Sequence, residues 1–186
     1  GEYPELQGIM GKYFAIAQGF EEDVANSVSD HYLPTGLTSV LPKKPFSYSI
    51  SIVDKVDTLV GFFVIDEKPT SSKDPFALRR AAIGLLRIII ENKLTFKLRD
   101  LISYNIRLYQ EQGVEIRNEK TEQQVLEFIK ERMRNVLKLK NIKADMIEAS
   151  ISSHAGDDFL ALYVKTILMN KYKKKGVGLN AISSYK

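Results

Sequence analysis

Four side chains could take part in acid–base or metal chemistry. The chain has two histidines, His31 and His154, and no cysteine, so thiolate nucleophiles, disulfides and thiolate zinc sites are excluded. Asp54 and Asp57 are three residues apart in a stretch with helical apolar spacing, so they share one face of a helix. Two carboxylates placed in this way could bind a metal ion, act as an acid and a base, or pair with arginines.

The sequence around His31 allows two interpretations. Asp30-His31-Tyr32 invites comparison with helical metal-dependent phosphohydrolases, in which adjacent His and Asp side chains hold a metal ion, but the order here is inverted and no second histidine accompanies it. A histidine near a helix C-terminus is favourable when it is protonated, which predicts a structural role instead. A phosphohydrolase that uses Asp54 and His31 is the alternative enzyme hypothesis.

Arginines close to the paired acids favour a structural role for them as well. Arg79 and Arg80 lie one loop away in the sequence, and a buried carboxylate without a partner is costly. We therefore predict ion pairs between Asp54 or Asp57 and Arg79 or Arg80. The sequence contains no Gly-rich phosphate loop and no Ser-His-Asp set, so we predict neither a catalytic residue nor a metal site.

The stretch from Lys68 to Ala82 begins as a polar loop and becomes the central helix of the chain. Asp74 is a suitable N-cap, and Pro75 suits the first helical position because its missing N–H group costs nothing there. Apolar residues continue to Ile90, so we predict a largely buried helix over residues 75–92.

Almost every other segment has helical periodicity, and we predict an all-α fold. The first helix should open at Pro4 and stop near Gly19, and serines at 47, 49 and 51 leave a strand there as the less favoured alternative. Thr95 and Thr121 are the expected N-caps of two later helices. The remaining predicted helices cover residues 21–32, 45–63, 95–112, 121–139 and 144–152, with a last one beginning at residue 157 or 158. A boundary near residues 93–95 would divide the chain into domains 1–93 and 94–186.

Composition and charge limit the class of protein. An apolar fraction of 44% is ordinary for a globular protein, and no apolar run approaches the length of about 20 residues that a membrane helix needs. The net charge is only +4, but residues 165–186 contain six lysines and no acid. A basic end of this kind indicates an anionic partner such as RNA. Gly1 starts with mid-helix character, which suggests a piece of a longer chain.

Three long blocks of the sequence resemble the β subunit of bacterial tetrameric glycyl-tRNA synthetase. They are Pro4-Glu-Leu-Gln-Gly-Ile-Met-Gly11, Asp54-Lys-Val-Asp-Thr-Leu-Val-Gly-Phe-Phe63 and Pro69-Thr-Ser-Ser-Lys-Asp-Pro-Phe-Ala-Leu-Arg-Arg80, in the order and at spacings compatible with that family. Residues 84–91, Gly-Leu-Leu-Arg-Ile-Ile-Ile-Glu, extend the similarity. Beyond about residue 95 it consists mainly of helix pattern and length.

The resemblance implies a fold, partners and a division of labour. Residues 1–93 would form an HD-like helical domain, and residues 94–186 a helical linker or body region that precedes an anticodon-binding domain. The family is a cytoplasmic α₂β₂ enzyme that joins glycine to its tRNA with ATP and Mg²⁺, the α subunit carrying the active site and the β subunit recognising tRNA. This part of the β subunit would bind no cofactor, would not meet a membrane, and would be inactive alone.

RNA duplexes are recognised mostly through phosphate, 2′-OH groups and shape, so lysines and polar loops are the expected contacts. The candidate tRNA-binding residues lie in two loops: Lys43, Lys44, Lys68, Ser71, Ser72 and Lys73. Basic rows further along are second choices: Lys130, Arg134 and Lys138, and then Lys171, Lys173, Lys174 and Lys175. A structural scaffold that docks other domains without binding RNA is the third hypothesis.

Overall fold

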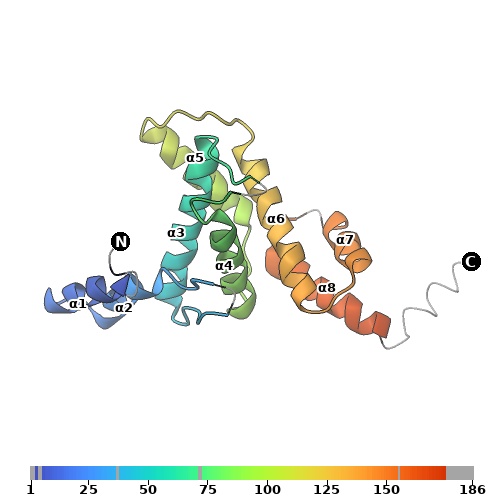
Figure 1. Cartoon of the computed structure of the whole chain (residues 1–186), viewed down its shortest axis with the longest axis horizontal. Helices are drawn as coiled ribbons and strands as arrows, with labels where there is room; N and C mark the ends of the chain where they lie inside the picture. Colours follow the sequence, from blue (N-terminus) through green and yellow to red (C-terminus); the bar gives the residue numbers. More distant parts are fainter. Residues whose placement is uncertain (1–2, 4–5, 37, 71–72, 155, 175–186) are drawn as a thin grey trace, which may run out of the picture.

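Every regular element in the described part of the chain is a helix, which confirms the all-α prediction. The computed structural model describes residues 3, 6–36, 38–70, 73–154 and 156–174. The helices, in order, are α1 (Ile9–Ala17), α2 (Glu22–Asp30), α3 (Pro45–Val64), α4 (Leu78–Glu91), α5 (Leu98–Glu111), α6 (Thr121–Leu139), α7 (Ala144–Ser152) and α8 (Phe159–Lys174). Figure 1 shows α1 and α2 at one end of the molecule and α7 and α8 at the other. Within these residues no helix is both long and apolar enough to cross a membrane.

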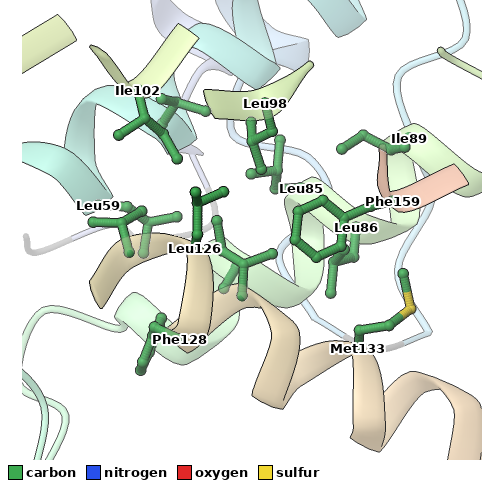
Figure 2. Packing of buried hydrophobic residues seen from close by; sticks show 14 of the residues in the cluster. Leu59, Leu85, Leu86, Ile89, Leu98, Ile102, Leu126, Phe128, Met133 and Phe159 are labelled. Carbon is green, nitrogen blue, oxygen red and sulfur yellow. The ribbon is translucent and has the colours of Figure 1, made fainter. Parts of the chain in front are cut away.

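One hydrophobic core joins α3 through α8. Leu59 of α3, Leu85 of α4 and Leu98 of α5 are almost completely buried in the same cluster as Met133 of α6 and Phe159 of α8 (Figure 2). The predicted boundary at residues 93–95 therefore falls between helices that share a core. Neither α1 nor α2 contributes a side chain to this cluster.

The central helix begins later than the sequence suggested. Ala77 has a left-handed backbone (φ 56°), and α4 starts at Leu78, so Pro75 lies in the preceding turn and the predicted start at Pro75 is wrong. Asp74 nevertheless caps the helix, because its carboxylate accepts hydrogen bonds from the N–H groups of Leu78 (2.8 Å) and Arg79 (3.0 Å). The prediction of Asp74 as the capping residue is therefore confirmed, but the helix starts four residues after Asp74 rather than directly after it.

Other helix limits are close to the prediction, with two corrections at N-termini. The prediction of a helix rather than a strand at Ser47 and Ser51 is confirmed, since both lie in α3 and are buried. Thr95 does not cap α5, which starts at Leu98. Thr121 is the first residue of α6 rather than its cap, and its hydroxyl donates to the carbonyl of Asn118 (2.6 Å). Pro4, the predicted start of the first helix, lies outside the described residues, and α1 begins at Ile9.

Buried polar groups fix the segment between α2 and α3. The ammonium group of Lys55, which is 5% exposed, donates to the His31 carbonyl at the end of α2 (3.0 Å) and to the Ser51 hydroxyl (2.8 Å). Ser51 in turn donates to the Leu33 carbonyl (2.6 Å). Because carbonyls at a helix C-terminus lack partners within the helix, this lysine supplies a donor that α2 otherwise lacks. Arg87 of α4 holds the same connection further along, through the Gly36 carbonyl (2.6 Å).

Candidate nucleic-acid interface

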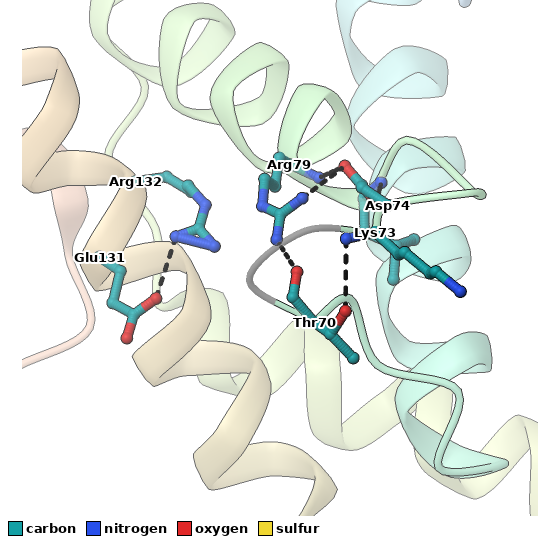
Figure 3. Close-up of polar contacts among 7 residues, drawn as sticks. Thr70, Lys73, Asp74, Arg79, Glu131 and Arg132 are labelled. Carbon is teal, nitrogen blue, oxygen red and sulfur yellow. Dashed lines mark hydrogen bonds and ion pairs between the residues drawn. The ribbon is translucent and has the colours of Figure 1, made fainter.

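The polar loop before α4 folds back on the first turn of that helix. The Thr70 N–H group donates to the Lys73 carbonyl (3.0 Å), and the Lys73 N–H group donates to the Thr70 hydroxyl (3.3 Å). The Arg79 guanidinium donates to the Thr70 carbonyl and lies 4.0 Å from the Asp74 carboxylate (Figure 3). These contacts leave the Lys73 side chain exposed beside an anchored arginine.

A further arginine reaches this loop from a distant part of the sequence. Arg132 of α6 lies beside Arg79 in Figure 3, stacks over the Phe128 ring (4.1 Å to its centroid) and pairs with Glu131 (2.9 Å). Burial lowers the pKa of Arg132, and the neighbouring Arg79 cation lowers it further. Arg79 and Arg132 thus lie side by side, with the Arg132 side chain only 12% exposed, and the exposed Lys73 belongs to the loop that Arg79 contacts. Sequence reasoning missed Arg132, because only the packing of α6 on α4 brings it there.

The predicted tRNA-binding lysines occupy two separate places. Lys43 and Lys44 immediately precede α3, whereas Lys68 lies shortly after Val64, the last residue of that helix. A helix of this length separates its two ends by about 30 Å. Lys44 pairs with Asp23 (2.6 Å) and Lys68 pairs with Asp66 (2.5 Å). Lys43 and Lys73 are exposed, and Ser71 and Ser72 lie outside the described residues. The structure therefore places Lys73 on the loop that Arg79 contacts and keeps Lys43 and Lys44 at the other end of α3.

The predicted pairing of the acids on α3 with arginines is not found in the structure. Arg79 turns to Asp74 and to the loop, and Asp57 instead accepts a hydrogen bond from the Tyr109 hydroxyl of α5 (2.9 Å). Within the described residues no ion pair joins Asp54 or Asp57 to Arg79 or Arg80. The physical reason is competition, because Asp74 lies closer to Arg79 in the chain and is already oriented by capping α4.

The second-choice basic rows are partly used in holding helices together. Arg134 of α6 donates to both carboxylate oxygens of Glu148 on α7, at 2.9 and 3.2 Å. Lys173 of α8 pairs with Asp145 of α7 (3.2 Å). Lys130 is half-buried and Lys138 and Lys171 are exposed, whereas Lys175 and the side chain of Lys174 lie outside the described part. The α6 row is thus a weaker candidate for RNA contact than the loop before α4.

The residues of the alternative phosphohydrolase hypothesis do not assemble into a metal centre. His31 directly follows α2, with its Nδ1 3.2 Å from the Ser27 carbonyl oxygen, and both His31 and Asp54 line a shallow groove on α2 and α3. Asp54 also borders an open cavity of about 440 Å³ together with Lys55 and Arg80. In the described ranges no group of three or more His, Asp or Glu side chains is placed to hold a metal ion.

Removing the cap of α4 should destabilise the protein measurably. Asp74→Ala deletes two hydrogen bonds to backbone N–H groups and the carboxylate beside Arg79, so we expect the free energy of unfolding to fall by about 1–2 kcal/mol. Asp74→Asn keeps one acceptor oxygen and should lose less. Urea denaturation followed by circular dichroism measures both changes, and equal stability of Asp74→Ala and wild type would contradict the capping role.

Comparison with known proteins assigns the chain to a family. The model of the family described as glycyl-tRNA synthetase beta subunit matches residues 1–152. Proteins named glycine–tRNA ligase beta subunit are similar along this whole chain: that of Rickettsia canadensis (strain McKiel) is 38% identical over 186 residues, and that of Paracoccus denitrificans (strain Pd 1222) is 37% identical over 186. That of Ruegeria sp. (strain TM1040) is 36% identical over 185 residues.

The chain spans about a quarter of the length of these curated relatives, with shares of 27%, 26% and 25%. The similarity nevertheless covers all of the present sequence. The family match includes the loop before α4 and every helix through α7. The chain belongs to the glycyl-tRNA synthetase β-subunit family.

Proposed function

We propose that this chain is the tRNA-binding and assembly part of the β subunit of a glycine–tRNA ligase. The observation that carries the proposal is the similarity of the whole chain to proteins of that name. The residues that the family model matches include the loop before α4. In this proposal the α subunit carries the active site and uses ATP and Mg²⁺ to activate glycine. The complete enzyme is a cytoplasmic α₂β₂ tetramer.

The surface around Lys73, Arg79 and Arg132 supports a role in RNA binding. Arg79 and Arg132 lie close together despite their like charge, and Lys73 is exposed on the loop whose Thr70 carbonyl Arg79 contacts. Glu131 and Asp74 offset part of the charge of the two arginines, and the exposed Lys73 adds a cation that can attract phosphate groups. Arg79 and Arg132 are also fixed by packing and hydrogen bonds, so they would support the surface rather than reach far into solvent.

Reconstitution of the charging reaction tests the proposal. We expect the α subunit mixed with a complete β subunit to attach glycine to its tRNA, and to lose that activity when the residues of this chain are deleted from β. A loss of tRNA affinity alongside the activity would locate the function in RNA binding. Charging and tRNA affinity that are both unchanged by the deletion would contradict the proposal.

A further inference from the structure

The first helix is apolar on nearly all sides and yet is largely exposed. Within α1 the only charged residue is Lys12, and the helix and the turn after it expose large apolar side chains. Their exposed fractions lie between 42% and 62%: Ile9, Met10, Tyr13, Phe14, Ile16 and Phe20. A helix that is apolar all round is normally buried, and exposed apolar patches of this kind mark interaction sites.

A single neighbour covers one side of α1. The helix packs on α2, where Ala15 and Ala25 are buried, and it has no comparable contact with another described helix. Gly11 lies so close to α2 that a Cβ atom there would approach the Val28 side chain to 2.7 Å. Figure 1 shows the pair of helices projecting from the rest of the fold. The contact with α2 thus leaves the outer sides of α1 in solvent.

The exposed apolar surface continues over α2 onto α3. Phe46, Ile50 and Val53 follow one stripe of α3 at helical spacing and are 46%, 42% and 49% exposed. With Val24 and Val28 of α2 they line a groove of about 520 Å³. Val28 contacts α1 and lines this groove, so the three helices present one connected surface. An apolar stripe between two helices is the geometry that accepts an amphipathic helix.

The groove has an acidic end. Asp54 and Asp57 border it, and within the described residues Asp54 forms no ion pair. Asp57 already accepts a hydrogen bond from Tyr109, so Asp54 is the carboxylate at this end of the groove that can pair with a docked helix. At the other end of α2, Asp23 is already neutralised by Lys44. A helix that fits the groove would therefore carry an apolar face and a lysine or arginine placed over Asp54.

We propose that the exposed face of α1, α2 and α3 is the docking site for a basic amphipathic helix from the remainder of the same β-subunit polypeptide. The inference rests on the proposed function, in which this chain works as part of a complete β subunit. The relatives are nearly four times as long as this chain, so they contain ample polypeptide to supply the helix. A segment tethered in the same molecule also has a high effective concentration at the groove.

Photo-crosslinking in a complete β subunit that carries this sequence tests the proposal. Phe46→p-benzoylphenylalanine and Phe14→p-benzoylphenylalanine place the probe on the surface, and Tyr172→p-benzoylphenylalanine on α8 is the matched control, since Tyr172 is 58% exposed. We expect cross-links from the first two positions to a helix of the same polypeptide, and markedly fewer from the third. Cross-links to the α subunit, to a second β copy, or at no more than the control level would overturn the proposal.

The acidic end of the groove gives a second readout on the same complete subunit. Asp54→Lys should lower the yield of the Phe46 cross-link by about threefold or more, because it removes one surface ion pair and places a like charge opposite the basic helix, whereas Asp54→Glu should keep the yield. Glu22→Lys, an exposed acid on α2, is the control. Equal yields for Asp54→Lys and wild type would overturn the charge matching. Measuring tRNA affinity on the Asp54 variants separates this proposal from the proposed function, because Asp54 is not a candidate tRNA-binding residue.

Discussion

Leu85→Ala should lower the free energy of unfolding by about 2–5 kcal/mol, the range for a fully buried leucine cut to alanine in a well-packed core. Leu85 is 0% exposed and belongs to the cluster that joins α4 to α5, α6 and α8. Figure 2 shows it between Leu98 and Phe159, which come from the second half of the chain. The substitution therefore leaves a cavity where the first and second halves of the chain meet, and the loss of stability should affect both halves.

Hydrogen exchange and urea denaturation check this result together. We expect amides of α3 and of α6 to lose protection in parallel in Leu85→Ala, and we expect one unfolding transition. Leu139→Ala is the matched control, because Leu139 is 66% exposed at the end of α6 and its loss should cost little. Two separate transitions, with α6 unaffected by Leu85→Ala, would contradict the shared core and would favour independent domains that meet at residues 93–95.

Lys55 should make the protein gain stability as the pH rises through the mildly alkaline range. Burial lowers the pKa of Lys55 to about 8 in the folded protein, whereas an unfolded lysine titrates near about 10.4. Between these values the unfolded chain binds more protons than the folded one, so the free energy of unfolding rises with pH. The full difference amounts to about 3 kcal/mol, because one unit of pKa corresponds to about 1.4 kcal/mol.

The comparison of wild type with Lys55→Met isolates this effect. We expect the free energy of unfolding of wild type, minus that of the variant, to increase by about 2–3 kcal/mol between pH 8 and pH 10. The window stops there because the unfolded lysine loses its own proton at about pH 10.4, above which the gain levels off. Burial and the bond to Asp57 also raise the pKa of Tyr109 to about 12, but Tyr109 is present in both proteins and its contribution cancels in the difference. Lys138→Met, at an exposed position of α6, is the control. Parallel pH curves for wild type and Lys55→Met would contradict the buried ammonium group.

Helices were predictable where the apolar pattern alone sets them. The long stripe of α3 and the isolated pattern of α7 appear at the expected residues, because local periodicity and the turns around them agree. The start of α4 was not predictable from this pattern. Asp74 caps the helix across three intervening residues, and Ala77 has a left-handed backbone conformation. Sequence patterns place helices well and place their first turns poorly.

The candidate site was predictable only in part, for reasons of tertiary packing. The exposure of Lys73 was predictable because loops rich in Pro, Ser and Lys lie at the surface. Arg132 was missed because it lies 53 positions after Arg79 in the sequence and no local signal connects the two. The expected partner of Arg79 was wrong, because the backbone turn at Thr70 and the cap at Asp74 supply nearer acceptors. The exposure of α1 likewise depends on what packs against it, which its apolar sequence does not reveal.

The salt dependence of tRNA affinity is the most direct test of the central proposal, that this chain binds tRNA. The α subunit with a complete β subunit would be compared with a variant in which Lys43, Lys44, Lys68 and Lys73 are each changed to glutamine. The control changes four exposed lysines elsewhere on the surface, Lys97, Lys120, Lys140 and Lys143, in the same way. We expect weaker binding at low salt in the first variant, and a control like wild type. The log–log salt slope of the first variant should be shallower by about 0.7–0.9 for each phosphate group that a lysine no longer neutralises. An affinity and a slope equal to wild type in the first variant would contradict the account.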